Sequence, residues 1–131
     1  MLLSVRPGAD REKRQAIVEL WYREQIRQAL PALLATWAPV IGVKVEAVSV
    51  QRMKTKWGSC NTSAKTIRLN TDLAKLAPHC LEYVLVHELV HLLERRHNDR
   101  FTALMDRFMP RWPHYRAELN SSALSNQDWD Y

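Results

Sequence analysis

The sequence predicts an α+β fold, in which a small antiparallel sheet packs against an N-terminal helix, a buried central helix and further C-terminal helices. Three observations predict this class. Apolar residues recur at helical spacing before residue 39, alternate with polar residues between residues 43 and 70, and return to helical spacing after residue 78. Because 131 residues are the size of one modest domain, we expect residues 1–131 to form a single domain.

The composition is that of a soluble globular protein, with 47% hydrophobic and 25% charged residues. The two cysteines, Cys60 and Cys80, are too few for a disulfide framework, which favours a reducing compartment. We find no signal-peptide core and no stretch of membrane-spanning length, so we expect a cytoplasmic protein without a membrane partner. The net charge of +5 favours acidic partners, including nucleic acid or nucleotides.

The first predicted helix begins at Asp10, which is a good N-cap residue, and ends at Pro39 or Gly42. Pro31 lies inside this pattern. It should kink or divide the helix, because proline removes a backbone donor and clashes with the preceding turn. Apolar and polar residues then alternate over residues 43–51, as in a half-exposed strand.

A second strand is predicted at Thr66–Asn70, where Ile67 and Leu69 share one face. The segment between the two strands, KTKWGSCNTSAKT, supplies Gly, Asn and Ser as turn residues. We therefore expect the two strands to pair as a hairpin over about residues 43–70. Within this segment, we expect Trp57 to be a core or hairpin aromatic residue.

Helical signals return after the second strand. Thr71 or Asp72 can cap a short helical turn, and Pro78 suits the first turn of the long helix that follows. Apolar residues over 101–108 mark another helix, which Pro110 closes, and residues 112–119 predict a short final one. The polar tail from residue 120 onward is expected to be a loop or partly disordered.

The central helix carries polar side chains in an apolar surrounding. Between Leu81 and Leu93 the polar positions are Glu82, His87, Glu88 and His91. A helix that is apolar on every side is a buried helix. Leaving a buried charge or imidazole without a partner costs several kcal/mol, on the order of 2 to 7. A metal ion is an efficient partner for such groups.

The spacing of these groups predicts a metal site. His87 and His91 are four residues apart, so they lie within ~40° of each other around the helix axis and ~6 Å apart along it. Both imidazoles can therefore reach one ion at about 2.0 to 2.1 Å. Glu88 projects ~100° away from His87, which places its carboxylate beside the ion, where a general base is needed. Together the three residues form the HExxH pattern of zinc hydrolases.

His97 is the predicted third ligand. On an unbroken helix it would be rotated by ~240° from His91 and displaced by ~9 Å, too far to share the ion. If the helix ends near Glu94 and the chain turns back, His97 can bind the ion and leave the fourth position to water. Three protein ligands and one water are the catalytic zinc arrangement. The competing third ligands are carboxylates, Glu118 first and Asp106 second.

Two other functions remain open at this point. A metal-dependent hydrolase of phosphorylated substrates, of the nucleotide pyrophosphatase type, could hold phosphates with basic residues near the site. These residues are Lys54, Lys56, Lys65, Arg68, Arg95, Arg96 and Arg100. A nucleic-acid-associated domain with a structural zinc ion is the other alternative, and it requires four protein ligands and no role for Glu88.

Several segments resemble, in the same order, the YgjP-like metallopeptidases, relatives of the SprT-like zincins: MKTKWGSC, LEYVLVHELVHLLERRH, NDRF and PRW. The resemblance covers about residues 52–112. It implies a zincin-like fold, with His87, His91 and His97 as ligands of one zinc ion and Glu88 as the catalytic acid/base. It also implies a protein or peptide substrate, and a strand ending in KTKWGSC whose exposed edge lies near the cleft.

The expected reaction is hydrolysis by a zinc-bound water, with Glu88 accepting its proton. Tyr115, His114 and Arg100 are candidates for a second oxyanion donor, and Cys60 is expected to be a small buried residue rather than a ligand. The sequence departs from the metzincins, which share the histidine spacing, at Glu94, where they have glycine. The turn after the helix must therefore be made differently. Members of the YgjP-like family are also often longer at the N-terminus, with extra strands.

Overall fold

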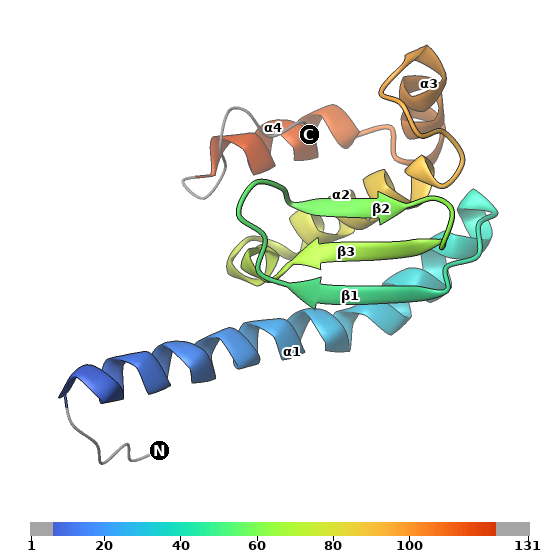
Figure 1. Cartoon of the computed structure of the whole chain (residues 1–131). Coiled ribbons are helices and arrows are strands. Elements are labelled where there is room, and N and C mark those ends of the chain that lie inside the picture. Colours follow the sequence, from blue (N-terminus) through green and yellow to red (C-terminus); the bar gives the residue numbers. More distant parts are fainter. Residues whose placement is uncertain (1–6, 123–131) are drawn as a thin grey trace.

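The computed structural model describes residues 7–122, which fold into helices around a three-stranded sheet (Figure 1). The elements in chain order are α1 (Pro7–Ile41), β1 (Ala47–Gln51), β2 (Gly58–Asn61), β3 (Thr66–Asn70), the 3₁₀ helix η1 (Thr71–Lys75), α2 (Pro78–His91), α3 (Asp99–Phe108) and α4 (Trp112–Ser121). The α+β class is confirmed. The tail prediction is wrong for residues 120 and 121, which belong to α4, and from residue 123 it lies outside the described residues.

Helix α1 is continuous, so the expected division at Pro31 does not occur. It also starts before Asp10, which is therefore not its N-cap. The helix ends as expected at Gly42, whose φ of 81° is a conformation that glycine adopts without strain. The amides of Gly42 and Val43 both donate to the carbonyl of Ala38, at 2.9 and 3.0 Å, and so satisfy the end of the helix.

Tertiary packing explains why α1 tolerates an internal proline. Ile26 and Leu30 lie in the core ahead of Pro31, and Ile41 is buried behind it, so both sides of the proline are held by burial. The N-terminal part of the helix extends beyond the sheet (Figure 1), and Leu20 and Trp21 are exposed there.

No helix among residues 7–122 combines the length and apolarity needed to cross a membrane.

The sheet has the order β1-β3-β2, and the predicted pairing of its strands is wrong. Strand β1 runs parallel to β3, with Ala47 opposite Thr66, rather than forming a hairpin with it. The hairpin is made instead by β2 and β3, which are antiparallel, with Gly58 opposite Leu69. Gly58 and Asn61, two of the predicted turn residues, belong to β2 instead, and the segment before β2 carries the chain past β3 to its far side.

Asn70 holds this crossing segment in place. Its side-chain amide donates to the carbonyls of Met53 and Lys56, at 2.9 and 2.8 Å, and its backbone amide donates to the carbonyl of Trp57 at 2.9 Å. Its side-chain oxygen also accepts from the amide of Asp72, which makes Asn70 the N-cap of η1. A fully buried amide that uses both ends in this way fixes the approach to β2.

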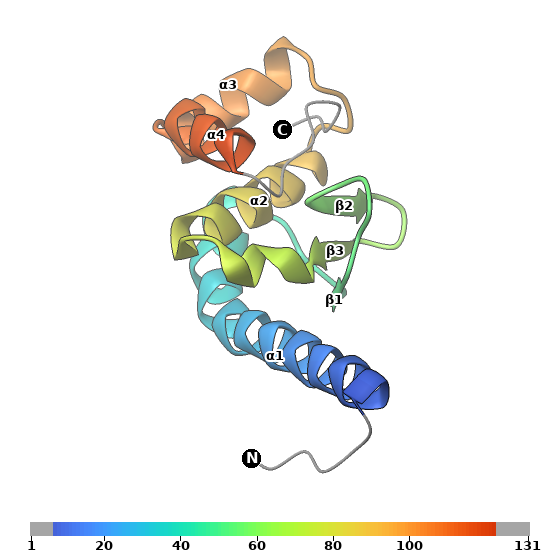
Figure 2. The same ribbon diagram turned by 90° about the vertical axis from the view of Figure 1, so that its left-hand side faces the viewer.

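The core lies between one face of the sheet and α2. Ile67 and Leu69 of β3 point into it, together with Val84 and Leu85 of α2, and no helix formed by residues 7–122 lies over the other face of the sheet (Figures 1 and 2). Trp57 is completely buried, which confirms its prediction as a core residue. Glu82, near the start of α2, has a partner on another helix, because Trp37 of α1 donates its indole N–H to the Glu82 carboxylate at 2.8 Å.

Candidate metal centre

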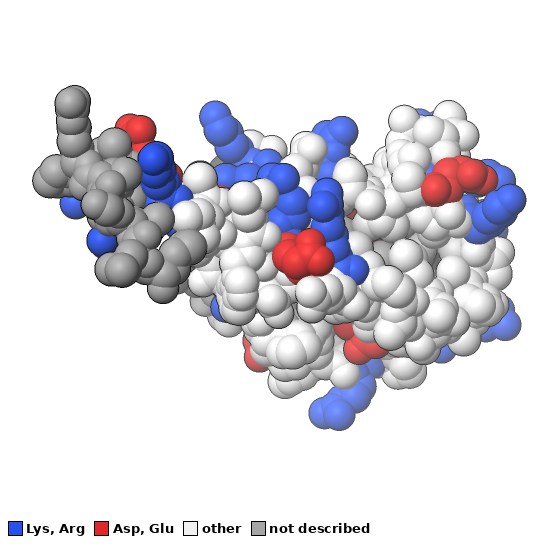
Figure 3. All heavy atoms as spheres, turned by 90° about the horizontal axis from the view of Figure 1, so that it is seen from below, with Lys and Arg blue, Asp and Glu red and all other residues white. Residues whose placement is uncertain are grey.

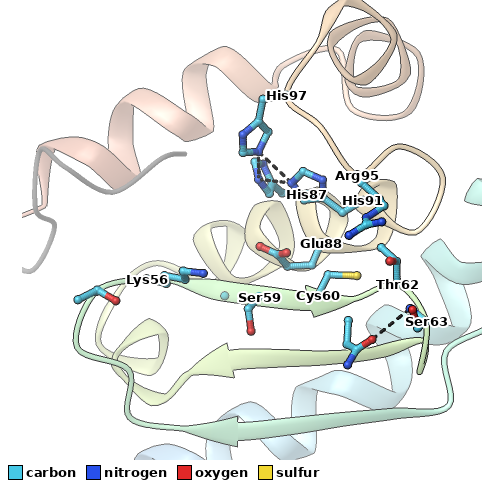
Figure 4. Close-up of a pocket in the computed structure, with 13 residues that line it drawn as sticks. Lys56, Ser59, Cys60, Thr62, Ser63, His87, Glu88, His91, Arg95 and His97 are labelled. Atoms are coloured by element: carbon cyan, nitrogen blue, oxygen red, sulfur yellow. Dashed lines mark hydrogen bonds between the residues drawn. The ribbon is translucent and has the colours of Figure 1, made fainter.

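Helix α2 brings two of the predicted site residues together. His87 and His91 are both buried, and their Nε2 atoms are 3.2 Å apart, as expected from one helical turn. Glu88 is 3% exposed, and its carboxylate lies between the histidines and β2 (Figure 4). The local geometry that the spacing predicted for these three side chains is therefore present.

The third histidine arrives from the segment between α2 and α3. The Nε2 atom of His97 lies 2.9 Å from that of His91 and 3.1 Å from that of His87, so the three atoms form a nearly equilateral triangle (Figure 4). Ligands placed tetrahedrally around zinc at about 2.0 to 2.1 Å would be ~3.3 Å apart. The three imidazoles therefore fit one such ion after shifts of a few tenths of an ångström.

The chain returns toward α2 without a glycine. Helix α2 closes with amides of Leu93 and Glu94 that donate to the carbonyl of Val90, at 2.9 and 3.0 Å. The carboxylate of Glu94 then accepts from the side chains of Asn98 and Arg100, at 3.1 and 3.3 Å. Within residues 7–122, positive φ angles occur at Lys65 and Gly42 and nowhere in this turn. The residue that replaces the metzincin glycine thus organises the turn by hydrogen bonds.

Side-chain and backbone groups orient the histidines. The Nδ1 of His91 lies 3.0 Å from the carbonyl oxygen of Glu94. Because a carbonyl only accepts, Nδ1 carries the proton and the lone pair of Nε2 faces the cluster. The ring of Phe101 packs on all three imidazoles, with centroids 5.0, 4.5 and 5.0 Å from those of His87, His91 and His97. Phe101 is a positioning residue that its helical pattern alone did not reveal.

Burial also fixes the protonation state of His87. Its pKa is held well below the ordinary value, first by burial and then by the neighbouring His91 and His97 and by Arg116. The imidazole is therefore neutral at neutral pH, and only a neutral imidazole can donate its lone pair to a metal ion.

Neither competing carboxylate lies in the cluster. Glu118 contacts His79 instead, and Asp106 accepts a hydrogen bond of 2.7 Å from the indole of Trp112. Among the described residues, the group of possible metal ligands at this place consists of His87, His91 and His97. Of the three candidates for a third ligand, His97 is therefore the one that lies beside His87 and His91.

A cavity of about 590 Å³ lies between α2 and β2 and includes the cluster. Its lining combines the three histidines and Glu88 with residues of the β2 region and one arginine (Figure 4): Thr55, Lys56, Gly58, Ser59, Cys60, Asn61, Thr62, Ser63 and Arg95. Of the seven basic residues noted in the sequence, all of them described, Lys56 and Arg95 reach this cavity. The three oxyanion candidates do not line it, and Arg100 is engaged with Glu94.

Gly58 allows β2 to approach Glu88 closely. A Cβ at this position would lie 3.2 Å from Cγ of Glu88, 3.1 Å from Cγ1 of Val84 and 3.2 Å from the carbonyl oxygen of Arg68. These contacts are tighter than ordinary van der Waals separation, and one of them is to backbone. The glycine read as a turn residue in the sequence is thus a close-packing residue under the carboxylate.

Cys60 lines the cavity together with Glu88, and its thiol should lose its proton only at high pH. Burial, and then the charge of Glu88, raise the pKa of its thiol to about 11. In metal-free protein we expect alkylation of Cys60 by iodoacetamide to be slow at pH 8 and to rise through about pH 11, because the thiolate is the nucleophile. Mass spectrometry of the peptide that contains Cys60 measures this profile.

The Glu88→Gln variant supplies the control for this profile. It removes the second cause of the shift, so its alkylation curve should move to lower pH while staying above the ordinary value, because burial remains. A wild-type midpoint near the ordinary pKa of about 8.5 would contradict the prediction.

Comparison with solved structures shows the class of the fold. The chain is similar to the metallopeptidase zymogen of Pyrococcus abyssi, abylysin, with a TM-score of 0.66 and 21% identity over 73% of this chain and 96% of that one. It is also similar to the zymogen jannalysin of Methanocaldococcus jannaschii, with a TM-score of 0.57 and 20% identity over 73% and 94%. The fold is therefore that of the zincin-like metallopeptidases.

The family follows from the sequence itself. The family model described as "YgjP-like, metallopeptidase domain" matches residues 2–122, and the chain belongs to this family. Comparison with the curated proteins found no match. The resemblance drawn from the motifs is confirmed, and the family and the fold support a metallopeptidase that acts on proteins or peptides.

Proposed function

We propose that this chain is a zinc-dependent metallopeptidase in which His87, His91 and His97 hold the ion and Glu88 is the general base. The observation that carries the proposal is the convergence of three Nε2 atoms, 2.9 to 3.2 Å apart, in the cavity that Glu88 also lines. Imidazole nitrogens are ligands suited to zinc. When bound, zinc would act as a Lewis acid and bring the pKa of a coordinated water to about 7.

Glu88 performs the proton transfers in this proposal. Among the described residues that line the cavity it is the one carboxylate, and its stem is held between Gly58 and α2. It accepts a proton from the water that attacks the peptide carbonyl and passes this proton to the leaving amine. Its near-complete burial limits competition from bulk water for the same carboxylate.

Strand β2 is the proposed substrate-binding edge. The sheet order places it at an edge, with β3 on one side, and Ser59, Cys60 and Asn61 line the cavity. An extended peptide can add to such an edge through main-chain hydrogen bonds. In this position a peptide would lie along the cavity between β2 and the histidines (Figure 4).

Substrate assays decide between this function and the hydrolysis of phosphorylated substrates, which Lys56 and Arg95 could assist. Metal-depleted protein, with and without added zinc, is incubated with unfolded casein, with fluorogenic peptides and with nucleoside triphosphates. We expect zinc-dependent cleavage of the polypeptides. Release of pyrophosphate from nucleotides without any polypeptide cleavage would overturn the peptidase assignment.

The family and the solved structures that the chain resembles are metallopeptidases, and they give the nucleic-acid alternative no support. On the face shown in Figure 3, several Lys and Arg side chains lie in a short run beside one acidic group, and most of the rest of that face is uncharged. A nucleic-acid-binding surface usually gathers its basic residues into a continuous patch or stripe. The short run on this face is no argument against the peptidase proposal, which requires no nucleic-acid partner.

A further inference from the structure

A second group of metal-ligand side chains lies where α4 crosses the start of α2. It consists of His79 and Cys80 in the first turn of α2 and Glu118 of α4, and one ligand atom from each lies within 4.8 Å of the others. None of the three lines the cavity of the histidine cluster. His79 precedes His87 by eight residues, which is about 12 Å along the helix, so the two groups are separate.

The three side chains differ in exposure: the thiol is buried, and the imidazole and the carboxylate are partly open to solvent, so a metal ion from solvent can reach them. Cys80 is 2% exposed, whereas the side chains of His79 and Glu118 are 39% and 41% exposed. The imidazole Nε2 of His79 is in direct contact with a carboxylate oxygen of Glu118. The ring of Tyr115, one turn before Glu118, packs beside His79 with centroids 5.5 Å apart. The imidazole is therefore held in place between α2 and α4.

The charges of this group favour a cation. Burial, and then the charge of Glu118, raise the pKa of the Cys80 thiol, so the carboxylate is close enough to oppose a second negative charge. The first turn of α2 has no acidic residue and no side-chain cap, and Glu118 brings a carboxylate to it from another helix. A divalent ion would offset the repulsion between thiolate and carboxylate, and the thiol proton would leave to solvent.

We propose that His79, Cys80 and Glu118 form a second transition-metal site, suited to zinc, that ties α4 to the beginning of α2. One nitrogen, one sulfur and one oxygen ligand from two helices, with water in the fourth position, match the donor types and number that zinc accepts. A plain ion pair would need only His79 and Glu118. The buried sulfur beside them is the feature that the metal site explains.

Cobalt spectroscopy on the full chain tests this site separately from the peptidase proposal. The histidine cluster has no thiolate ligand, so cobalt bound there gives no sulfur-to-metal charge-transfer band. We expect metal-depleted wild-type protein to develop such a near-ultraviolet band on cobalt titration. The Cys60→Ser variant, which removes the other cysteine, should keep the band, and Cys80→Ser should lose it.

Because Cys80 is buried, exposed positions provide a second test. His79→Gln and Glu118→Gln should retain the wild-type fold by circular dichroism, bind one zinc ion fewer than wild type by mass spectrometry, and lose most of the band. A wild type without the band, a band that depends on Cys60, or unchanged zinc content in both exposed variants would each overturn the proposal. These results do not depend on whether the histidine cluster hydrolyses peptides.

Discussion

Replacement of Glu88 by glutamine is expected to reduce kcat/KM for peptide hydrolysis by about 1,000-fold, while the protein retains as much zinc as the wild type. A glutamine amide has nearly the same shape as the carboxylate but cannot accept the proton of the attacking water, and general acid–base catalysis contributes about 10² to 10⁴-fold. Glu88 is 3% exposed and packs closely against Gly58. Because glutamine has the same size and shape, the substitution should preserve this packing. A fluorogenic peptide assay and metal analysis by mass spectrometry measure the two quantities.

Glu82→Gln is the matched control. Glu82 lies on the same helix but accepts the indole N–H of Trp37 and does not line the cavity. We expect its kcat/KM to change less than about threefold, because a neutral amide oxygen can still accept that hydrogen bond. Wild-type activity in Glu88→Gln would favour a structural zinc ion, and loss of zinc from that variant would make Glu88 a ligand rather than a base.

The part of the site that lies on one helix could be predicted from the sequence. The positions of His87, Glu88 and His91 relative to one another follow from helical geometry alone, and α2 spans the expected residues. Its burial could be predicted too, because apolar residues surround these positions on every side. Local periodicity was sufficient because no distant contact is needed to place these side chains.

The position of His97 depends on contacts between side chains, which cannot be predicted from the periodicity of the sequence. It requires the helix to end near Glu94, the carboxylate of Glu94 to accept from Asn98 and Arg100, and Phe101 to support the rings. Spacing allowed two outcomes for this histidine, one inside the cluster and one outside it. Only the hydrogen bonds of the turn decide between them.

The sheet also depends on contacts between distant residues, and here the prediction from the sequence failed for the pairing of the strands. Alternation identified β3 and placed Ile67 and Leu69 on its buried face, but it carries no information about the partner of a strand. The strand order β1-β3-β2 is accompanied by contacts between distant parts of the chain: Asn70 anchors the crossing segment, and Gly58 fits β2 against α2. Asn70 and Gly58 were read as strand-end and turn residues, since their long-range roles leave no periodic signal.

Glu118 illustrates how sequence can select the right residue for the wrong place. Its type suggested a metal ligand, and it lies within a group of possible metal ligands, but 39 positions from its partner His79 and away from the histidine cluster. The crossing of α4 over the start of α2 decides where this carboxylate acts. A search by residue type alone cannot make that assignment.

Replacement of His97 by alanine is expected to raise the zinc concentration needed for half-maximal peptidase activity by at least about 100-fold. Even changes to groups that only orient ligands reduce metal affinity by about 10 to 100-fold, and here one of three ligand atoms is removed. Zinc titration of metal-depleted protein, with activity as the readout, measures this change. Activity reports on the histidine cluster alone, so zinc bound elsewhere on the chain does not affect the comparison.

Glu118→Ala and Asp106→Asn are the controls, because these carboxylates were the competing third ligands. Both lie away from the cluster, in contact with His79 and Trp112, so their zinc titration curves should match the wild type within about threefold. Wild-type behaviour in His97→Ala together with weakened zinc activation in Glu118→Ala would move the third ligand to the carboxylate. The 2.9 and 3.1 Å distances from His97 to the other two Nε2 atoms argue for the opposite result.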